Sequence, residues 1–537
     1  MAGSNIYREL TPRLALVSFI GSLGALNFGF DIGWWGCILG APYFNQQYGS
    51  ATVTNATTGA TSKTLSASEQ SAGTGIGTAG IMLGIMFAPW FNEKYGRKRS
   101  FLLLAVVGII GTVVQAASTV GRKYWVLVTG KLILNFSIGI ASAVVGVYLS
   151  ECSPATVRGT LLSNYNVVQN IGYLISSGCV YGVVLKMAPI NWLLPICMQA
   201  VLPVVIIICS PLIPESPRWL IAQGRTEEAT EVIRMLRKQG TEEYEIAVVL
   251  EVAEIKAAYE EIKILHDGVG WVELFRGANL RRTLVAIGLQ CLQQAQGVSF
   301  VSNYILITMI GLGIHNPYAI IVAIYSVLLV TSLGAFYLPD RIGRRPLLLV
   351  GSASGAIWMA VFGTISAVAT VPTGNLANFL VASLFLYIAF FSNTWSVMPW
   401  TVSAEISAAP LREMTLAIGA WSGFGVGLIV VFVSPYLQHA EYAGLGGKIA
   451  FVWMGFSIIS GIWVFFMVPE LKNRSLEELD YMFEARVPIR KFKSFDTTEL
   501  LAQKKREHGT DRVASVIIDE KTDLEPTSEP VKRLEYV

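Results

Sequence analysis

The sequence predicts an all-α membrane protein whose twelve transmembrane helices form two pseudo-symmetric halves of six helices each. Three observations support this fold class: a strongly apolar composition, twelve stretches long enough to span a bilayer, and short motifs that recur in the second half. Of the 537 residues, 53% are hydrophobic and only 14% are charged, whereas soluble domains carry about 25% charged residues. A soluble core could not use so much apolar surface.

Twelve mainly apolar stretches have about the 20-residue length that a membrane-spanning helix needs. Six lie between residues 14 and 212 and six between residues 283 and 468. The expected spans are 14–39, 71–91, 101–119, 124–149, 161–186, 193–212, 283–311, 317–338, 346–370, 377–404, 414–437 and 449–468.

Three polar segments lie outside the spans. Residues 1–13 form a short N-terminal segment. The central loop, 213–282, is rich in charge and predicts short amphipathic helices, as over residues 226–238. The tail, 469–537, is expected to be largely disordered after about residue 495, because its polar composition cannot bury enough apolar surface to fold.

The placement of Lys and Arg predicts the orientation of the chain. Basic loops alternate with loops that contain few or no basic residues, and cytoplasmic loops carry the excess of Lys and Arg. Arg122 and Lys123 interrupt this alternation without changing its balance. Both termini and the central loop are therefore expected in the cytoplasm. The basic loops are 93–99, 156–159, 213–282, 340–346 and 411–413, and the others are 43–70, 312–316, 371–376 and 438–447.

Asn-x-Ser/Thr sequences occur at Asn55, Asn135 and Asn473. Only Asn55 lies in a loop expected on the outer side of the membrane. Asn55 is therefore the one expected glycosylation site, provided that the host is a eukaryote.

Three motifs recur at nearly constant spacing. Each follows a corresponding span in the two halves, which indicates a duplicated six-span unit. Two parallel six-span halves are the arrangement of major-facilitator transporters, which bind substrate between the halves near the membrane midplane. The leading acids of the motifs are Glu93 and Asp340, 247 residues apart, Glu151 and Glu405, 254 apart, and Glu215 and Glu470, 255 apart.

These repeated motifs place acids and arginines together at the cytoplasmic ends of helices. One exposed ion pair contributes only about 0–1 kcal/mol, but several partly dry pairs can bias a two-state equilibrium. We predict a cytoplasmic gate that holds the outward-open state and breaks when the carrier opens inward. The alternative is that these charges only fix topology, but topology needs only Lys and Arg. The predicted gate residues are Glu93, Arg97, Glu151, Arg158, Glu215 and Arg218 in the first half, and Asp340, Arg341, Arg344, Glu405, Arg412 and Glu470 in the second.

Several longer motifs are specific enough to resemble one family. They are FGFDIG (28–33), EKYGRKR (93–99), PESPRWL (214–220), QQAQG (293–297), DRIGRRP (340–346), PWTVSAEI (399–406) and VPELKNRSLEELD (468–480). Over about residues 14–485 the chain resembles the sugar porter family of the major facilitator superfamily, and FEARVPIRKF (483–492) resembles the ending of fungal members. The resemblance implies a plasma-membrane carrier of a sugar or similar polyhydroxylated solute, often driven by a proton gradient. It implies no cofactor other than the proton as co-substrate and no nucleic-acid partner, and a monomer suffices.

The resemblance also implies which residues bind the solute. Side-chain amides match the hydroxyl groups of a sugar, and aromatic rings pack against its C–H faces. The alternative for each amide is hydrogen bonding between helices, a common use of Asn and Gln in membranes. The implied binding residues are Asn166, Gln169, Gln293, Gln294, Ser299, Asn303, Trp395, Trp400 and Trp421.

Three of these positions depart from the family pattern: Asn166 stands in place of the usual Gln, Ser299 in place of the usual Asn, and Asn303 in place of one residue of the usual tyrosine pair. Asn166 and Ser299 are shorter than the usual residues. The shorter side chains predict either of two things. The binding cavity is larger, as for a disaccharide, or the solute is a different polyol or an acid.

Asp31 is the only charged residue between Leu14 and Leu39. A charge at the centre of a membrane helix costs about 2.5–3.5 kcal/mol on the lenient insertion scale. Proton-coupled members of the family carry an Asp at this position, and its usual arginine partner falls on Lys131. We expect that protonation of Asp31 releases Lys131 and that sugar binds best to the protonated outward-open form. The alternatives are a structural ion pair that never titrates, and proton carriage by Lys131.

An enzyme is not expected, because the sequence contains no G-x-S-x-G, phosphate-binding loop or HExxH motif. No metal site is expected, because the four histidines lack metal-ligand spacing. Four alternatives to a sugar symporter remain: a proton-independent sugar uniporter, a quinate, polyol or small-metabolite carrier, an exporter, and a transporter-like sugar sensor. Uphill accumulation of solute would separate a symporter from a sensor and a uniporter.

Overall fold

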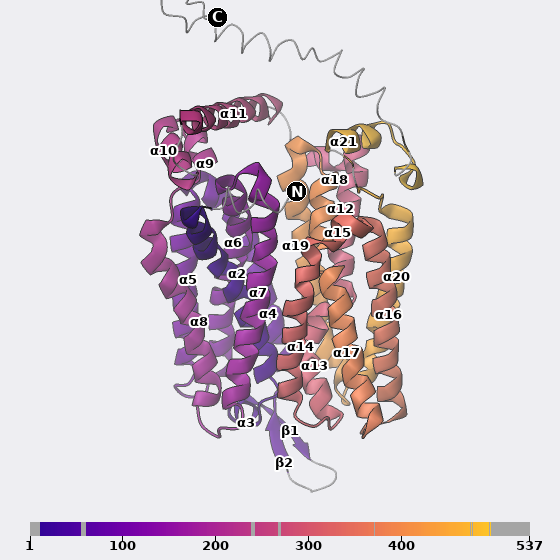
Figure 1. Cartoon of the computed structure of the whole chain (residues 1–537). Coiled ribbons are helices and arrows are strands. Elements are labelled where there is room, and N and C mark those ends of the chain that lie inside the picture. The colour runs from indigo at the N-terminus through magenta and orange to yellow at the C-terminus, as the bar shows by residue number, and fades with distance from the viewer. Residues whose placement is uncertain are drawn as a thin grey trace, which may run out of the picture.

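The computed structural model describes residues 11–492, apart from 55–60, 238–241, 267–269, 370, 473 and 475, and also residue 495. Long helices stand side by side in two bundles, one from α2 to α8 and the other from α12 to α20 (Figure 1). The first bundle contains α2 (Pro12–Ile38), α4 (Ala67–Tyr95), α5 (Arg97–Ala117), α6 (Tyr124–Cys152), α7 (Ala155–Val183) and α8 (Ile190–Cys209). The second contains α12 (Gly277–Ala295), α13 (Val298–Gly311), α14 (Pro317–Ser332), α16 (Arg344–Val368), α17 (Asn375–Asn393), α18 (Met398–Ile406), α19 (Arg412–Gln438) and α20 (Ala450–Met467).

Within the described residues, eleven helices or joined helix pairs are long and apolar enough to cross a membrane. The 29-residue α7, which packs against α2 and α14, completes the twelve spans. Two spans of the second bundle are broken, between α12 and α13 and between α17 and α18. At the first break Gly297 has a φ of +89°, and a β-carbon there would lie 2.5 Å from the Trp453 ring. Glycine therefore fits both the backbone conformation and the space.

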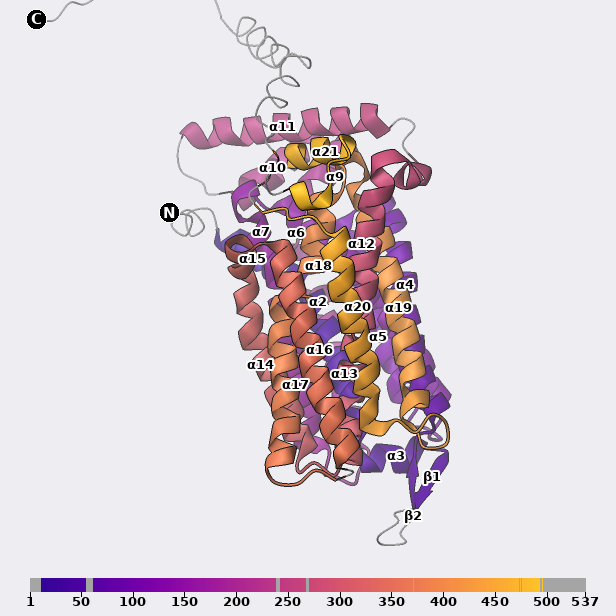
Figure 2. The ribbon, with the colours of Figure 1, turned by 90° about the vertical axis from the view of Figure 1, so that its right-hand side faces the viewer.

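The two ends of the bundles differ. One end, which we call the basic face, carries α9 (Pro217–Ala222), α10 (Thr226–Leu236), α11 (Glu242–His266), α15 (Leu338–Ile342) and α21 (Leu476–Glu484) (Figure 2). The amphipathic helix expected over 226–238 is thus observed as α10. The opposite end, the hairpin face, carries α3 (Pro42–Tyr48) and the strands β1 (Ala51–Thr54) and β2 (Thr61–Thr64). The strands pair antiparallel, with Ala51 opposite Thr64, and were not expected from the sequence.

Small residues bring the helices of the first bundle into close contact. A β-carbon at Gly84 of α4 would lie 2.2 Å from the carbonyl oxygen of Phe136 on α6, and one at Gly29 of α2 would lie 1.9 Å from that of Gln169 on α7. Glycine at such positions lets membrane helices pack backbone against backbone. The residues of α2, α4, α6 and α7 are thereby held at fixed depths relative to one another.

The apolar core differs between the two faces. At the hairpin face a single buried cluster joins both bundles, with Trp34, Ile38 and Phe44 from the first and Tyr304 and Val431 from the second. At the basic face the first bundle has a separate buried cluster, which contains residues between Val17 and Leu236 and none from the second bundle. The two halves are therefore packed together at the hairpin face and have separate cores at the basic face.

Helices α4 and α19 follow the same pattern. Near the hairpin face, the Ser71 hydroxyl donates to the carbonyl oxygen of Phe432 at 2.7 Å. At mid-depth, Met82 lies 3.8 Å from where a β-carbon on Gly425 would be. One turn nearer the basic face, Met86 and Trp421 are 62% and 43% exposed. Helices α4 and α19 are therefore in contact near the hairpin face and at mid-depth.

Candidate functional site

Asp31 and Lys131 form an ion pair inside the first bundle. The Lys131 Nζ lies 3.0 Å from Oδ2 and 3.1 Å from Oδ1 of Asp31. Their side chains are only 2% and 4% exposed. Asp31 lies on α2 and Lys131 on α6, so the pair joins two spans. The pair predicted from sequence is thus formed in the structure, and each charge compensates the other in a dry environment.

Other side chains complete this site. Gln199 of α8 donates its amide to Asp31 Oδ1 at 2.9 Å, and the Trp34 indole donates to the same oxygen at 3.3 Å. The Lys131 Nζ lies 4.5 Å from the centre of the Trp35 ring, a cation–π distance. Sequence reasoning missed Gln199, because a lone Gln in an apolar span gives no signal of what it contacts.

The amides of the second bundle gather around its two helix breaks. Gln293, near the end of α12, donates its amide to the carbonyl oxygens of Trp395 at 2.6 Å and Ser396 at 3.2 Å, in the break between α17 and α18. Free carbonyls in the membrane interior are costly unless they are hydrogen-bonded. Gln293 therefore has a structural task in addition to the binding role expected for it.

Gln294, Ser299 and Asn303 lie around the other break. The Ser299 hydroxyl donates to Gln294 Oε1 at 2.6 Å, and the Asn303 amide donates to the Ser299 carbonyl at 2.8 Å. Gln294 and Ser299 are partly exposed, whereas Asn303 is 8% exposed. The structure therefore brings these three predicted residues together in one hydrogen-bonded group.

The predicted residues of α7 lie where the two bundles meet. Asn166 and Gln169 are both partly buried, and the Gln169 amide donates to the Tyr173 hydroxyl at 3.4 Å. The Tyr173 ring stacks on Tyr325 of α14 with ring centres 5.1 Å apart. This stacked pair, missed by sequence reasoning, links Gln169 to the second bundle.

The three predicted tryptophans have different environments. Trp395 is fully buried, and its indole N–H donates to the Leu348 carbonyl and the Ser352 hydroxyl, each at 3.0 Å. Its ring therefore packs inside the second bundle in this conformation. Trp400 and Trp421 are 42% and 43% exposed. Of the three predicted tryptophans, these two have rings that are open to a solute or to lipid.

In the first bundle, a charge cluster forms at the basic face. The Arg97 guanidinium pairs with Glu151 at 2.7 Å and donates to the Asn92 carbonyl at 3.3 Å. Among the residues that the structure describes, Glu215 pairs with no arginine side chain. Its carboxylate accepts the main-chain N–H groups of Arg97 at 2.8 Å and Lys98 at 3.2 Å, at the start of α5. A carboxylate there is stabilised by the unpaired N–H groups and the helix dipole.

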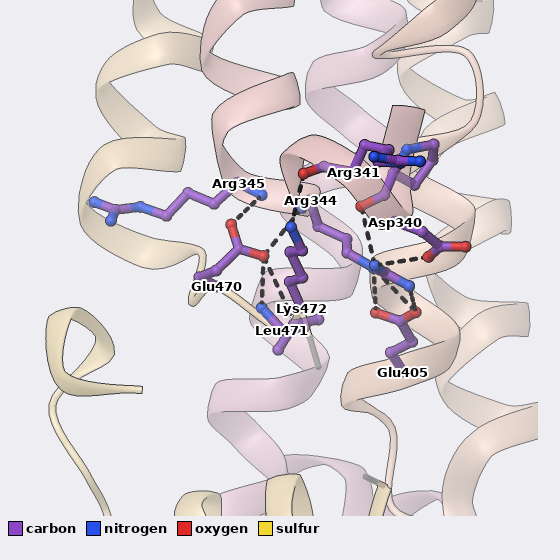
Figure 3. Close-up of polar contacts among 9 residues, drawn as sticks. Asp340, Arg341, Arg344, Arg345, Glu405, Glu470, Leu471 and Lys472 are labelled. Carbon is purple, nitrogen blue, oxygen red and sulfur yellow. Dashed lines mark hydrogen bonds and ion pairs between the residues drawn. The ribbon is translucent and has the colours of Figure 1, made fainter. Parts of the chain in front are cut away.

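The second bundle repeats this cluster (Figure 3). Arg344 forms two-pronged contacts with Glu405, the shortest 2.8 Å, and donates to the Pro339 carbonyl at 3.1 Å. Glu470 accepts the main-chain N–H groups of Arg344 and Arg345, at 3.1 and 3.2 Å, at the start of α16. Asp340 adds an exposed contact of 3.2 Å to Arg344.

Both clusters depend on a glycine that lies against the capping carboxylate. Gly96 and Gly343 have φ values of +89° and +105°. A β-carbon would lie 2.4 Å from Glu215 Oε2 at the first position and 2.8 Å from Glu470 Oε2 at the second. The duplicated motif therefore encodes a duplicated backbone shape as well as duplicated charges.

The predicted gate needs two corrections. Glu215 and Glu470 cap helices rather than pair with arginine side chains. Among the described residues, no ion pair is formed by the exposed side chains of Glu93, Arg218 and Arg341 or by Arg412, whose Nε is buried without a partner. The Arg158 side chain and Asn55 lie outside the described residues.

The two clusters do not join the halves. Each cluster lies within one bundle, and no described ion pair joins the two bundles. That the network holds the outward-open state and breaks when the carrier opens inward stays a prediction.

The fold and these sites define a membrane transporter with two six-span halves, and comparison with known proteins identifies its family. The family model described as "Sugar (and other) transporter" matches residues 17–483. A high glucose sensor of Saccharomyces cerevisiae is 31% identical, and the match covers 75% of this chain but only 53% of the sensor. A probable quinate permease of Aspergillus fumigatus is 26% identical over 88% of both chains, and a hexose transporter of S. cerevisiae is 28% identical over 77% of this chain and 76% of its own.

Solved structures agree on the fold. The proton:xylose symporter XylE bound to 6-bromo-6-deoxy-D-glucose has a TM-score of 0.69 at 20% identity, covering 88% of this chain and 100% of that chain. An inward open conformation of the xylose transporter XylE from E. coli has a TM-score of 0.70 at 21% identity, covering 87% and 99%.

The chain belongs to the sugar transporter family. It is a multi-pass membrane protein with the twelve-helix major facilitator fold, and it is a sugar porter, not an enzyme.

Proposed function

We propose that this protein imports a sugar, a mono- or disaccharide, together with a proton by alternating access. The observation that carries this proposal is the buried pair of Asp31 and Lys131. A buried ion pair contributes little net stability, so the fold does not need this pair in order to be stable. A carboxylate held by a cation, an amide and an indole is instead suited to exchange a proton when one partner moves away.

The proposed coupling follows from the groups around Asp31. Protonation of Asp31 removes the charge that holds Lys131 of α6 and Gln199 of α8 against α2. The three spans can then shift relative to one another. Because the binding of solute and proton is thermodynamically linked, each raises the affinity for the other. The proton is the only co-substrate that this scheme requires.

The solute is proposed to bind between the halves at mid-depth. Gln294, Ser299 and Asn303 supply polar atoms at the α12–α13 break. Asn166 and Gln169 supply amides from α7 of the first bundle, which contacts α14 of the second. Amides and hydroxyls of this kind pair with sugar hydroxyls, which both donate and accept. Trp400 and Trp421, being exposed, are the proposed aromatic surfaces for the C–H faces of the sugar.

The basic face is proposed to be the cytoplasmic face of the plasma membrane, with both termini on that side. Its excess of Lys and Arg supports this orientation. Under this orientation the described arrangement is inward-facing, because the halves share a core only at the hairpin face. The two charge clusters would then act as clamps that keep each half rigid while the halves rock against each other.

Uptake by yeast that lacks its own sugar transporters tests this proposal. Labelled mono- and disaccharides, polyols and quinate would be supplied at pH 5 and pH 7, with and without a protonophore. We expect uphill uptake of one sugar that collapses with protonophore and in Asp31→Asn. Glu441→Gln, which removes a carboxylate from an exposed loop at the hairpin face, is the matched control and should transport normally. Downhill uptake that ignores pH, protonophore and Asp31→Asn would refute symport.

A second candidate function is glucose sensing, which the 31% identity to a high glucose sensor favours. A sensor would bind glucose without moving it. Binding of glucose to the purified protein, combined with no uptake or exchange of any solute in the panel, would favour the sensor over the symporter. Uptake of quinate rather than sugar would instead place the protein with the quinate permeases.

A further inference from the structure

A shallow apolar hollow, which we call the groove, lies on the outer surface of the second bundle along one face of α20. It has a volume of about 310 Å³ and only apolar and aromatic lining residues: Ile459, Ile462, Trp463, Phe466 and Met467. Trp463 fits against Gly288 of α12, where a β-carbon would lie 2.2 Å from its ring. Ile462 and Phe466 are 56% and 59% exposed within a membrane span. The groove therefore opens toward the hydrocarbon of the bilayer.

Two arginines lie at the basic end of α20, and one of them contacts a ring that lines the groove. The Arg490 guanidinium lies 4.8 Å from the centre of the Phe465 ring and 5.7 Å from that of Phe466, which lines the groove. The Arg345 guanidinium lies 5.3 Å from the same Phe465 ring and donates to the Phe465 carbonyl at 2.8 Å. Both cations therefore lie where α20 leaves the membrane.

Neither guanidinium is neutralised by an acid. Among the described residues, no carboxylate pairs with Arg490 or with the Arg345 side chain. Glu470 accepts only the main-chain N–H of Arg345, whose side chain points away from the cluster around Arg344 and Glu405 (Figure 3). The Arg345 Nε is buried without a partner. Two cations that contact the same ring without a paired carboxylate favour the binding of an anion near them.

The segment that carries Arg490 is fixed in place. The Phe492 ring is fully buried and packs on Phe483 with ring centres 5.2 Å apart. Arg281, at the start of α12, donates to the Val487 carbonyl at 3.1 Å. Arg490 is thus held over the end of the groove by contacts on both sides of it in the chain.

We propose that this groove and its two arginines form a binding site for an anionic phospholipid in the leaflet at the basic face. One acyl chain would lie in the groove against Ile462 and Phe466, and the phosphate would lie between Arg345 and Arg490. Guanidinium groups bind phosphate oxygens through charge-assisted hydrogen bonds. Anionic lipids are concentrated in the cytoplasmic leaflet, which agrees with the proposed orientation. The site does not depend on which solute the protein carries.

Native mass spectrometry of the full-length protein in detergent tests this site. The probes are dioleoyl phosphatidylglycerol, dioleoyl phosphatidylcholine with the same acyl chains, and inorganic phosphate alone. We expect preferential binding of phosphatidylglycerol. Arg490→Gln should lower its affinity about fivefold, the effect of one basic residue near a lipid surface. Ile462→Trp, which fills the groove, should lower the affinity for phosphatidylglycerol about fourfold for each methylene group of the acyl chain that it displaces.

Arg225→Gln is the matched control, since it removes the same charge from an exposed arginine of the basic face that is paired with Glu228. It should leave phosphatidylglycerol affinity unchanged. An equal loss with Arg225→Gln, or equal binding of phosphatidylcholine, would overturn the proposal in favour of unspecific adsorption. Equal binding of inorganic phosphate would show that the arginines bind a free anion and that the groove plays no part. All variants should keep the wild-type melting temperature. If Ile462→Trp lowers the melting temperature, Ile459→Trp is used in its place.

Discussion

The two halves of this transporter are alike at the basic face and different at mid-depth. At the basic face, Arg97 with Glu151 and Arg344 with Glu405 form the same contacts around helix ends capped by equivalent carboxylates. At mid-depth, the first half holds one buried ion pair among continuous helices, whereas the second half holds amides around two broken helices. The two halves thus share their charge clusters and differ in the parts to which we assign proton and solute binding. The proton site and most of the solute site are therefore assigned to different halves.

The largest expected effect comes from separating the charges of the first half. Lys131→Ala leaves the Asp31 carboxylate buried without its cation, which costs about 3–5 kcal/mol when such a pair is broken from one side. We expect poor expression and a strongly lowered melting temperature of the purified protein.

The double variant Asp31→Asn, Lys131→Ala is the control for this effect. It removes both charges and should recover most of the lost stability. If the double variant is as unstable as Lys131→Ala, the pair is not an electrostatic unit.

In the second half, the effect of removing an amide side chain should depend on which of the two helix breaks that side chain contacts. Gln293→Ala leaves the carbonyls of Trp395 and Ser396 without their donor, at about 1–3 kcal/mol for each unsatisfied group. Gln294→Ala frees only the partly exposed Ser299 hydroxyl. We expect Gln293→Ala to lower the melting temperature and Gln294→Ala to raise the KM for solute at an unchanged melting temperature. Equal effects on both quantities would contradict this division of the Gln pair.

The similarity of the basic-face clusters can be tested by removing each helix cap. Glu215→Gln and Glu470→Gln weaken the same main-chain contacts at the starts of α5 and α16. Each should cost about 0.3–1 kcal/mol, the usual value for a charge at a helix N-terminus. Melting temperatures that fall by similar amounts would support equivalent clusters, and a large effect from only one of them would break the equivalence.

The smallest effect is expected from the one ion pair that the clusters do not share. Asp340 is 79% exposed where it contacts Arg344, and exposed pairs at this helical spacing contribute about 0.3–0.5 kcal/mol. Asp340→Asn should therefore leave the melting temperature and uptake nearly unchanged. A loss of uptake comparable to that in Glu405→Gln would mean that Asp340 has a role that its contacts do not reveal.

The membrane spans could be predicted from the sequence because hydrocarbon requires long apolar stretches, and the repeat could be predicted because its acids recur at nearly constant spacing. The pairing of Asp31 with Lys131 was accessible through the family resemblance. Tertiary contacts determine the helix breaks, the hairpin of β1 and β2 and the stacking of Tyr173 on Tyr325. We found no motif or periodicity in the sequence that predicts them. Glu215 and Glu470 were expected to bind arginine side chains, because a sequence shows which charges are near each other but not which main-chain N–H groups are free.

The central claim is that Asp31 couples the proton to the solute. The most direct measurement uses purified protein in liposomes, with uptake of the transported sugar driven by an imposed proton gradient and compared with sugar exchange at equal pH on both sides. We predict that Asp31→Asn loses gradient-driven uptake and retains exchange, because the variant still binds and moves solute but cannot release a proton. Gradient-driven uptake that persists in Asp31→Asn would contradict the account and leave the buried pair with a structural role only.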